Sequence, residues 1–280
     1  MKKKIPLIAA LVYLMNSAVL LAADKYPARI ASLSLASDEV LVDLIPLCGG
    51  LQRIIALSTL VDEPSMSSIT DKAHQIRGRV HSEPESLFAL KPDLVIGATF
   101  NRPELLKMTE SRKIPLLTLS HFTSADDIGS NIEKIGTAIG CLEQAKSMKK
   151  NFLKRVQPIT LVANPQSLLL FDSDLVIMGS ETLFDDLVKR AGGINAAAAH
   201  GIKAWPKLDS ESLITMNPDA IVVLKHDSPE LRANIRKHPA WGKLPAVKNQ
   251  KFIFLKSRTA QSTSHYFADG VEELRTKLKH

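Results

Sequence analysis

The stretch TSADDIGSNIEKIGTAIGCLEQAKSMKKNFLKRV, residues 123–156, decides how the rest of the chain is interpreted. Its apolar residues recur every three or four positions, and residues 123–127 supply capping and acidic side chains at its start. The pattern predicts one helix of roughly 30 residues, about 45 Å long, which is more than a single small lobe needs. Gly136 and Gly140 leave open a division into two helices in line. We therefore expect residues 123–157 to form a helix that bridges two bodies of structure.

Short β-rich runs alternate with helical runs on both sides of this stretch. Strands are expected at residues 30–33, 53–57, 94–97, 115–119, 168–171, 220–224 and 251–255, and helices at 37–47, 83–90, 182–191, 210–216, 228–237 and 264–278. A further helix is expected to be capped by Asn101, with Pro103 in its first turn. Strands separated by helices favour parallel sheets that are covered on both faces. The prediction is an α/β fold with two Rossmann-like lobes, residues 24–122 and 158–280, whose parallel-rich sheets are bridged by one long helix.

An internal echo favours two related lobes. Glu85, Ser86 and Leu87, followed by Pro92 and Asp93, recur at identical spacing as Glu211, Ser212 and Leu213, followed by Pro218 and Asp219. Each copy predicts a helix that enters a strand through a Pro-Asp turn. The alternative is that two unrelated units have converged on a common turn.

The start of the chain has the composition of a secretory signal. Three lysines, residues 2–4, precede an apolar run that ends in Ala22 and Ala23. We expect residues 1–23 to be a cleaved signal peptide and the mature protein to be periplasmic, the alternative being a short uncleaved anchor. The formal net charge is +7, but the basic residues are interspersed with acids, so nucleic acid is not an expected partner. Cys48 and Cys141, the two cysteines, could form a disulfide in an oxidising compartment.

The sequence contains few signs of catalysis. The eight histidines include no pair with the short helical spacing of a zinc site, and no nucleophile elbow or phosphate loop is present. We therefore expect neither an enzyme nor a bound cofactor. Ligands of α/β lobes bind at the loops beyond the carboxyl ends of parallel strands. Those loops and their neighbours supply flat apolar side chains, planar cationic donors and other polar groups: Phe100, Phe122 and Trp205; Arg79 and Arg258; and Ser37, Asn101 and His121.

The chain resembles the periplasmic substrate-binding proteins of ABC importers for vitamin B12, ferric siderophores and haem. In that family one long helix bridges two α/β lobes. The resemblance extends over nearly everything after Ala23 and is carried by residues 29–37, 83–97, 191–195, 205–206, 241–247 and 264–278. It implies a monomeric receptor that binds a small-molecule metal chelate and works with an ABC permease in the inner membrane. It also implies that Glu85 and Glu211, one in each lobe, dock on arginine pockets of that permease.

The resemblance gives three alternatives for the ligand. Arg79 stands where siderophore-binding relatives have an arginine that contacts chelating oxygens, so a ferric siderophore is favoured. The aromatic cage of the B12 receptors is matched mainly at Trp205, which makes cobalamin or another corrinoid an alternative. Haem is the third, with His265 and Tyr266, or His121, as axial ligands. Alternatives of another class are a free metal-ion receptor, a periplasmic hydrolase and an interaction module without a small ligand.

Overall fold

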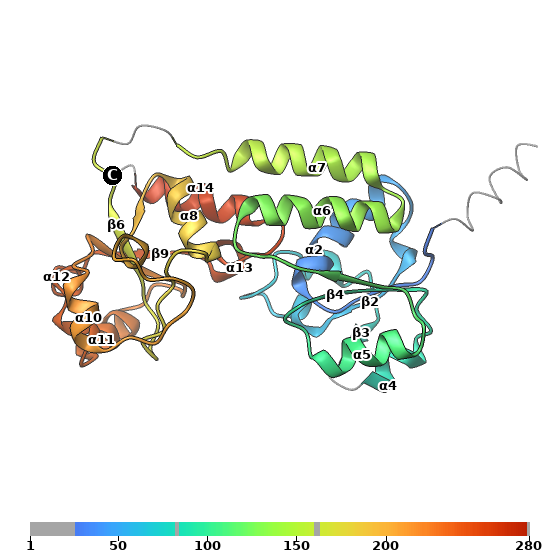
Figure 1. Cartoon of the computed structure of the whole chain (residues 1–280), viewed down its shortest axis with the longest axis horizontal. Coiled ribbons are helices and arrows are strands. Elements are labelled where there is room, and N and C mark those ends of the chain that lie inside the picture. The colour runs from blue at the N-terminus through green and yellow to red at the C-terminus, as the bar shows by residue number, and fades with distance from the viewer. Residues whose placement is uncertain (1–25, 82–83, 160–162, 279–280) are drawn as a thin grey trace, which may run out of the picture.

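The computed structural model describes residues 26–81, 84–159 and 163–278. The expected signal peptide, residues 1–23, lies outside the described residues. Two sheets lie at opposite ends of an elongated molecule, and two long helices, α6 (Ala125–Ile139) and α7 (Leu142–Arg155), run along one side (Figure 1). The predicted α/β class with two parallel sheets is confirmed.

The first sheet has five parallel strands in the order β3-β2-β1-β4-β5. They are β1 (Ile30–Ser32), β2 (Ile54–Ser58), β3 (Arg79–Val80), β4 (Leu94–Ala98) and β5 (Leu116–Leu119). All five residues of β4 are buried, which explains why its sequence is an uninterrupted run of apolar residues and glycine. The edge strand β3 was not predicted, because two residues are too few to show a period.

The second sheet has four parallel strands in the order β7-β6-β8-β9. They are β6 (Ser167–Leu170), β7 (Ile194–Asn195), β8 (Ala220–Val223) and β9 (Phe252–Phe254). Three of these strands were predicted; β7, again only two residues long, was not.

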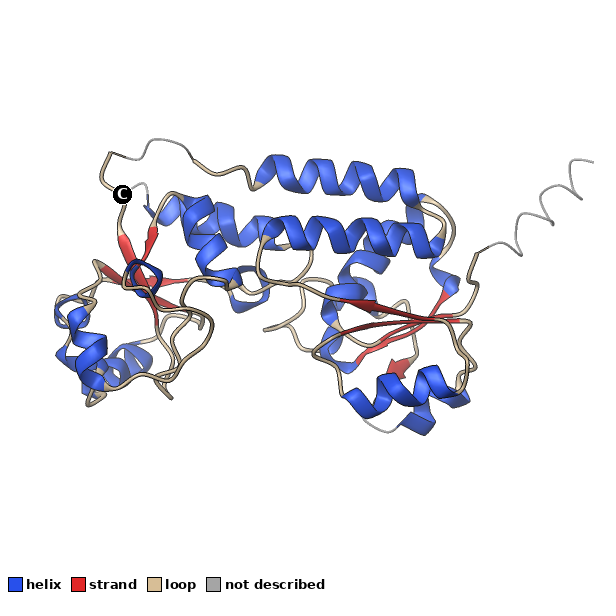
Figure 2. Ribbon diagram, in the orientation of Figure 1, coloured by secondary structure: helices blue, strands red, loops and turns tan. Residues whose placement is uncertain are grey.

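Helices cover both sheets (Figure 2). Around the first sheet they are α2 (Leu35–Leu44), α3 (Thr70–Ala73), α4 (Pro84–Ala89) and α5 (Pro103–Ser111). Around the second they are α8 (Leu183–Ala191), α9 (Ala196–Ala199), α10 (Ser210–Thr215), α11 (Pro229–Lys237), α12 (Pro245–Lys248), α13 (Ser257–Ala260) and α14 (Phe267–Leu278). Short 3₁₀ turns occur at η1 (Ile45–Leu47), η2 (Leu51–Arg53), η3 (Thr59–Asp62) and η4 (Trp241–Lys243).

The prediction of one unbroken helix over residues 123–156 is wrong. Gly140 adopts a left-handed conformation, with φ +77°, and ends α6 as a C-cap. The chain then reverses, and α7 returns antiparallel along α6 (Figure 1). A Cβ atom on Gly136 would lie 2.1 Å from the Cβ of Ala145, so this glycine allows the two helices to approach closely. The continuous apolar stripe is therefore the inner seam of a helical hairpin, and the two helices are not in line.

The hairpin contacts both lobes. At the start of α6, the backbone N–H of Ala125 donates to Asp186 Oδ2 of α8 at 2.7 Å, and Arg190 Nη2 pairs with Asp126 Oδ2 at 2.7 Å. At its far end, a disulfide joins Cys141 to Cys48, whose Cα atoms are 5.7 Å apart. The bond left open by the sequence is therefore formed, and it anchors the turn of the hairpin to the first lobe.

One hydrophobic core extends through both lobes and the hairpin. It contains Leu41 of α2, Ile135 of α6, Val188 of α8 and Phe267 of α14, all with no exposed surface. Because side chains from all of these elements share one buried cluster, the lobes are packed together beside the hairpin.

Candidate functional site

The two lobes meet at loops that follow the carboxyl ends of their strands. Arg258 Nη1, in α13 after β9, donates to the carbonyl oxygen of Pro64, in the loop after β2, at 3.2 Å. Ser68 Oγ donates to the carbonyl oxygen of Arg258 at 3.5 Å. A hollow of about 460 Å³ lies between the two segments. Hydroxyl and cationic groups of Ser67, Ser68, Thr70, Lys256, Arg258 and Tyr266 line it together with the carboxylates of Asp71, Asp269 and Glu273.

A second hollow, of about 470 Å³, adjoins the first. Pro64, Lys256, Arg258 and Glu273 line both. Arg258 therefore presents a planar cation to both hollows at the junction of the lobes. Lys256, which was not predicted, adds a second positive charge.

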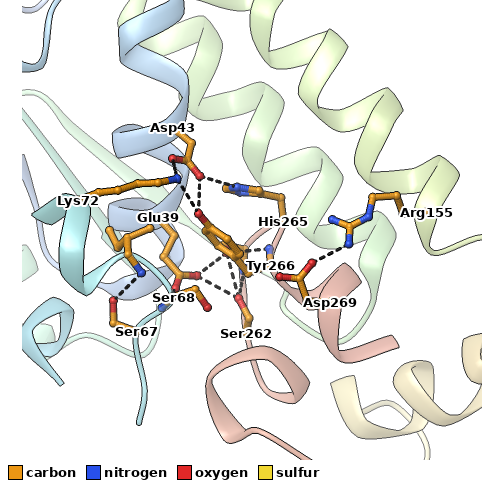
Figure 3. A network of polar contacts seen from close by, with 12 residues as sticks. Glu39, Asp43, Ser67, Ser68, Lys72, Arg155, Ser262, His265, Tyr266 and Asp269 are labelled. Carbon is orange, nitrogen blue, oxygen red and sulfur yellow. Dashed lines mark hydrogen bonds and ion pairs between the residues drawn. The ribbon is translucent and has the colours of Figure 1, made fainter. Parts of the chain in front are cut away.

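A buried carboxylate holds the two sides of the first hollow together. Glu39 of α2 is 2% exposed and accepts hydrogen bonds from Ser262 Oγ and Ser264 Oγ of the second lobe (Figure 3). Its other oxygen accepts the backbone N–H of Ser68 at 2.8 Å. Burial raises the pKa of Glu39, while the bonds from Ser264, Ser68 and Ser262 oppose that shift. The bonded carboxylate fixes the loop after β2 against the C-terminal segment.

One turn further along α2, Asp43 binds three side chains. Lys72 Nζ lies 2.6 Å from Oδ1, and Tyr266 Oη and His265 Nε2 lie 2.7 Å and 3.0 Å from Oδ2 (Figure 3). Burial alone would raise the pKa of Asp43, but the bonds from His265, Lys72 and Tyr266 together hold it well below its ordinary value.

This arrangement does not support His265 and Tyr266 as a pair of haem ligands. Nε2 of His265 and the phenol of Tyr266 both bind Asp43, and the two residues line different hollows. Burial and the hydrogen bond to Asp43 raise the pKa of Tyr266 to about 12, which disfavours the phenolate that would bind iron. The two side chains lie at the junction of the lobes, where they connect α14 to α2.

The three aromatic residues predicted to contact ligand lie on loops near the strand ends. Phe100 follows β4 and Phe122 follows β5, and their ring centroids are 5.0 Å apart. Trp205 lies in a loop that pairs with the segment after β6, since the N–H of Gly179 donates to the carbonyl oxygen of Ala204. Phe100 is 59% exposed and Trp205 53% exposed, which is unusual for such large apolar side chains. The two lobes therefore each present an aromatic side chain to solvent.

Two predicted ligand contacts, Ser37 and Asn101, are hydrogen-bonded within the first lobe, and a third, His121, is exposed. Ser37 is fully buried and its hydroxyl bonds Ser32 Oγ at 2.6 Å. The amide of Asn101 accepts from the N–H of Ala98 at 2.7 Å and donates to Leu33 at 3.0 Å. Both side chains therefore hold the loops in place. His121 is exposed, and its carbonyl oxygen accepts a hydrogen bond from Asn131 Nδ2 of α6.

Arg79 is not positioned as predicted. Its side chain is 14% exposed and forms two 2.7 Å bonds to the carboxylate of Asp62, from Nε and Nη2. The remaining donors bind the carbonyl oxygens of Ile76, Gly78 and Ala73. The guanidinium in turn holds the pKa of Asp62 below its ordinary value. Every donor group of Arg79 is therefore occupied within the first lobe, and none is left to bind the chelating oxygens of a siderophore.

Glu85 and Glu211, the two residues expected to dock on a permease, are both exposed in the first turn of a helix. They belong to α4 and α10, which lie on the side of the molecule opposite α7 (Figure 1). Two negative charges are thus available at separate points of one side.

Sequence reasoning missed Glu39, Asp43 and Lys72. A signal was present, because Glu39 and Asp43 are four residues apart on a helix whose other residues are mostly apolar, so the two carboxylates lie on the same side of that helix. Within the described residues, no group of three or more His, Cys, Asp and Glu side chains is arranged to hold a metal ion. Across residues 26–81, 84–159 and 163–278, no helix has the length and apolar character needed to cross a membrane.

Comparison with known proteins agrees with this architecture. The sequence profile of the periplasmic binding protein family matches residues 30–259. The chain is 24% identical over 262 residues to the uncharacterized ABC transporter substrate-binding lipoprotein YvrC of Bacillus subtilis, covering 89% of this chain and 79% of that protein. It is 27% identical over 225 residues to a vitamin B12-binding protein of Yersinia pseudotuberculosis, covering 78% and 76%. Among solved structures, a possible iron-binding periplasmic solute-binding protein of Staphylococcus epidermidis superposes with a TM-score of 0.75 at 21% identity, covering 91% of this chain and all of that one.

Proposed function

The chain belongs to the periplasmic binding protein family, and on this basis we propose that it is a solute receptor that binds a metal chelate between its two lobes and delivers it to an ABC permease. The observation that carries the proposal is the position of Arg258 in two adjoining hollows at the junction of the lobes. Exposed aromatic side chains on loops of both lobes support it. The site of action is the periplasm, which agrees with the predicted signal peptide and with the family.

An anionic ferric siderophore is the ligand class we propose. Arg258 and Lys256 supply the positive charge that carboxylate, hydroxamate or catecholate oxygens require, in the role first expected of Arg79. Phe100, Phe122 and Trp205 supply flat apolar faces for the organic part of such a chelate.

A cobalamin or haem is the second candidate. The exposed ring of Trp205 and the neighbouring rings of Phe100 and Phe122 could stack on a large planar ligand just as they could contact a siderophore. For haem, the axial ligand would have to be a residue other than the bonded pair His265 and Tyr266, and the exposed His121 is the available alternative.

We propose lobes at residues 24–122 and 158–280, with the helical hairpin between them, and only small movements when ligand binds. The shared core and the bonds from Glu39 to Ser262 and Ser264 cross the junction, and separating the lobes would expose them to water. Affinity would then come from side chains already in place rather than from lobe closure.

The ligand assignment can be tested by tryptophan fluorescence. The second tryptophan, Trp241, is fully buried and donates Nε1–H to the carbonyl oxygen of Asp172 at 3.0 Å, so it serves as an internal reference. Wild type is titrated with ferric siderophores, cobalamin and haem, and the best ligand is then titrated into Arg258→Gln and Trp205→Phe. We expect Arg258→Gln to weaken binding of an anionic chelate, whereas Arg236→Gln, a change on exposed helix α11, has no effect. Unchanged affinity in Arg258→Gln and Trp205→Phe would refute the site.

Permease docking needs a separate experiment. We propose that Glu85 and Glu211 orient the receptor on basic pockets of the permease. Transport should be lost in the double variant Glu85→Ala/Glu211→Ala and retained in Glu104→Ala/Glu230→Ala, which removes an exposed first-turn glutamate from another helix of each lobe. Transport that survives the first pair would disprove this docking surface.

A further inference from the structure

A lysine-lined groove lies along the outer flank of the hairpin, away from the junction of the lobes. The hollow measures about 680 Å³ and is bordered by Glu133 of α6 and by one flank of α7 and its following turn. The α7 residues are Lys146, Lys149, Lys150, Leu153 and Lys154. Four cations and one carboxylate therefore surround it, and we call it the α7 lysine groove.

The lysines of this groove differ in their partners. Lys149 Nζ binds Glu133 Oε2 at 2.6 Å and Lys146 Nζ binds Glu143 Oε1 at 2.8 Å. Lys150 and Lys154 are exposed, and no carboxylate of the described residues lies within ion-pairing distance of either. The two glutamates thus fix the neighbouring lysines, and the charges of Lys150 and Lys154 remain available.

The floor of the groove is shaped by a glycine. A Cβ atom on Gly129 would lie 3.3 Å from Lys149 Cγ and 3.6 Å from Leu153 Cδ1. Its absence lets the stems of these α7 side chains lie close to the α6 backbone. The lining therefore combines apolar side-chain stems with ammonium groups, as a bound chain segment with acidic side chains would require.

Spacing along α7 favours an extended peptide. Lys146, Lys150 and Lys154 are four residues apart, so successive lysines are about 6 Å apart along the helix axis. In an extended chain, alternate side chains point the same way at intervals of about 6.6 Å. Acidic side chains at alternate positions would therefore meet successive lysines.

We propose that the α7 lysine groove binds an extended acidic segment of another protein. Helix α7, which supplies most of the lining of the groove, is on the side of the molecule opposite α4 and α10 (Figure 1). The groove would therefore stay accessible if the receptor docks on its permease through those helices. A partner could thus be bound while ligand is delivered. An anionic membrane fits less well, because the apolar side chain in the groove, Leu153, is half-buried and offers no anchor.

The test is fluorescence anisotropy with the full-length mature protein at low salt. The probe is a labelled peptide in which glutamate alternates with serine, compared with a peptide of the same composition whose glutamates form one block. We expect the alternating peptide to bind more tightly, and Lys150→Glu/Lys154→Glu to weaken its binding about tenfold or more. The control Lys243→Glu/Lys248→Glu changes the net charge equally at two exposed lysines of the second lobe and should bind as wild type does.

Several outcomes would overturn the proposal. Equal affinity for the two peptides would show that the spacing of the acidic side chains does not matter. An equal loss of affinity in both charge-reversal variants would show that binding depends only on the net charge of the protein. Binding to phosphatidylglycerol vesicles without binding to the alternating peptide would assign the groove to a membrane surface. Unchanged peptide binding in Lys150→Glu/Lys154→Glu would exclude the groove altogether.

Discussion

Asp93 and Asp219 make the same backbone contact in the two sheets. The carboxylate of Asp93 accepts the N–H groups of Ala28 and Arg29, just before β1, at 2.8 Å each. The carboxylate of Asp219 accepts the N–H of Ser167, at the start of β6, at 2.8 Å. Asp93 directly precedes β4, whose parallel neighbour is β1, and Asp219 directly precedes β8, whose parallel neighbour is β6. In each lobe the aspartate therefore binds the backbone at the start of the neighbouring strand.

The rest of the internal echo is equivalent as well. Leu87 and Leu213 are both fully buried, and the residues before the two prolines, Lys91 and Asn217, both have positive φ. The helix, the strained turn and the carboxylate contact therefore form one unit that occurs twice. The repeated residues predicted this correspondence because the leucine and the aspartate have the same structural role in both copies. The leucine is buried in the core, and the aspartate binds the backbone of the neighbouring strand.

We predict that Asp93→Ala and Asp219→Ala each lower the free energy of unfolding. Loss of a backbone contact of this kind costs about 1 kcal/mol per bond, so Asp93→Ala, which loses two, should be the more damaging. Urea unfolding followed by circular dichroism measures the difference. Asn at either position should restore part of the loss, because its amide oxygen can still accept. Equal stability of all variants and wild type would contradict the prediction.

The main elements of the fold were predictable from the sequence, but the hairpin turn and the two-residue edge strands β3 and β7 were not. The alternation of strands and helices was enough to predict two parallel sheets, and the central strands β4 and β8 contain only apolar residues and glycine. The hairpin was not predictable from period alone, because a stripe such as Ile128, Ile132, Ile135 and Ile139 continues equally well onto a straight helix or onto a returning one. The left-handed conformation of Gly140 decides between them, and glycine permits that conformation without requiring it.

Gly136 and Gly129 should respond in opposite ways to alanine. A Cβ on Gly136 would overlap Ala145 Cβ at 2.1 Å, so Gly136→Ala should separate α6 from α7 and destabilise the protein by about 1–3 kcal/mol. A Cβ on Gly129 would meet only the flexible stem of Lys149 at 3.3 Å, and alanine has the higher helix propensity. Gly129→Ala should therefore be neutral or stabilising by up to about 1 kcal/mol. Thermal and urea unfolding compare the pair, and an equal effect of both changes would be evidence against close helix packing at Gly136.

The candidate site was predictable only in part. Phe100 follows β4 and Arg258 follows β9, at the carboxyl ends of strands where the parallel-sheet rule expects ligands. The rule says nothing about which side chains pair with one another. It could not reveal that Arg79 is bonded to Asp62 within the first lobe, or that His265 and Tyr266 are bonded to Asp43 across the junction of the lobes. Those partners are between 17 and 223 residues away in sequence, and tertiary packing alone brings them together.

The disulfide should contribute strongly to stability. It closes a loop with a sequence separation of 93 residues and joins the turn of the hairpin to the end of the 3₁₀ turn η1, which follows α2. We expect reduction to lower the free energy of unfolding by about 2–4 kcal/mol. Urea unfolding with and without dithiothreitol measures this, and Cys48→Ser/Cys141→Ser should match the reduced wild type and be insensitive to reductant. If the double variant is as stable as the oxidised protein, the bond has no stabilising role.

Stability should also depend on pH through Asp38. This side chain is buried, and burial raises its pKa from 3.8 to about 7, although hydrogen bonds from Ser32 and Ser58 oppose the shift. Between about pH 4 and pH 7 the folded protein therefore binds more protons than the unfolded chain, so its stability falls as the pH rises. The slope from one such group is at most about 1.4 kcal/mol per pH unit. Glu39, whose pKa is also raised, acts in the same direction.

Asp43 acts in the opposite direction, because its lowered pKa gives stability that is lost as the pH falls below about 4. We therefore expect a stability maximum in mildly acidic solution. Urea unfolding across the pH range should show that Asp38→Asn reduces the decline between about pH 4 and pH 7, whereas Asp174→Asn, at an exposed site, leaves it unchanged. A decline that is identical in Asp38→Asn and wild type would mean that Asp38 ionises normally in the folded protein.

Arg79 and Arg258 should separate stability from ligand binding. The guanidinium of Arg79 binds Asp62 twice and contacts three carbonyl oxygens, so Arg79→Gln should destabilise the first lobe by about 1–3 kcal/mol. Arg258 makes one 3.2 Å bond to the carbonyl oxygen of Pro64 and borders two hollows, so Arg258→Gln should cost about 1 kcal/mol or less in stability. For an anionic chelate the affinities should follow the reverse order, with a loss of about tenfold or more in Arg258→Gln and little change in folded Arg79→Gln. Urea unfolding and fluorescence titration of the same preparations give both quantities. A large loss of affinity in Arg79→Gln with normal stability would show that Arg79 contacts the ligand after all. The ion pair between Arg79 and Asp62 would then have to break when the ligand binds.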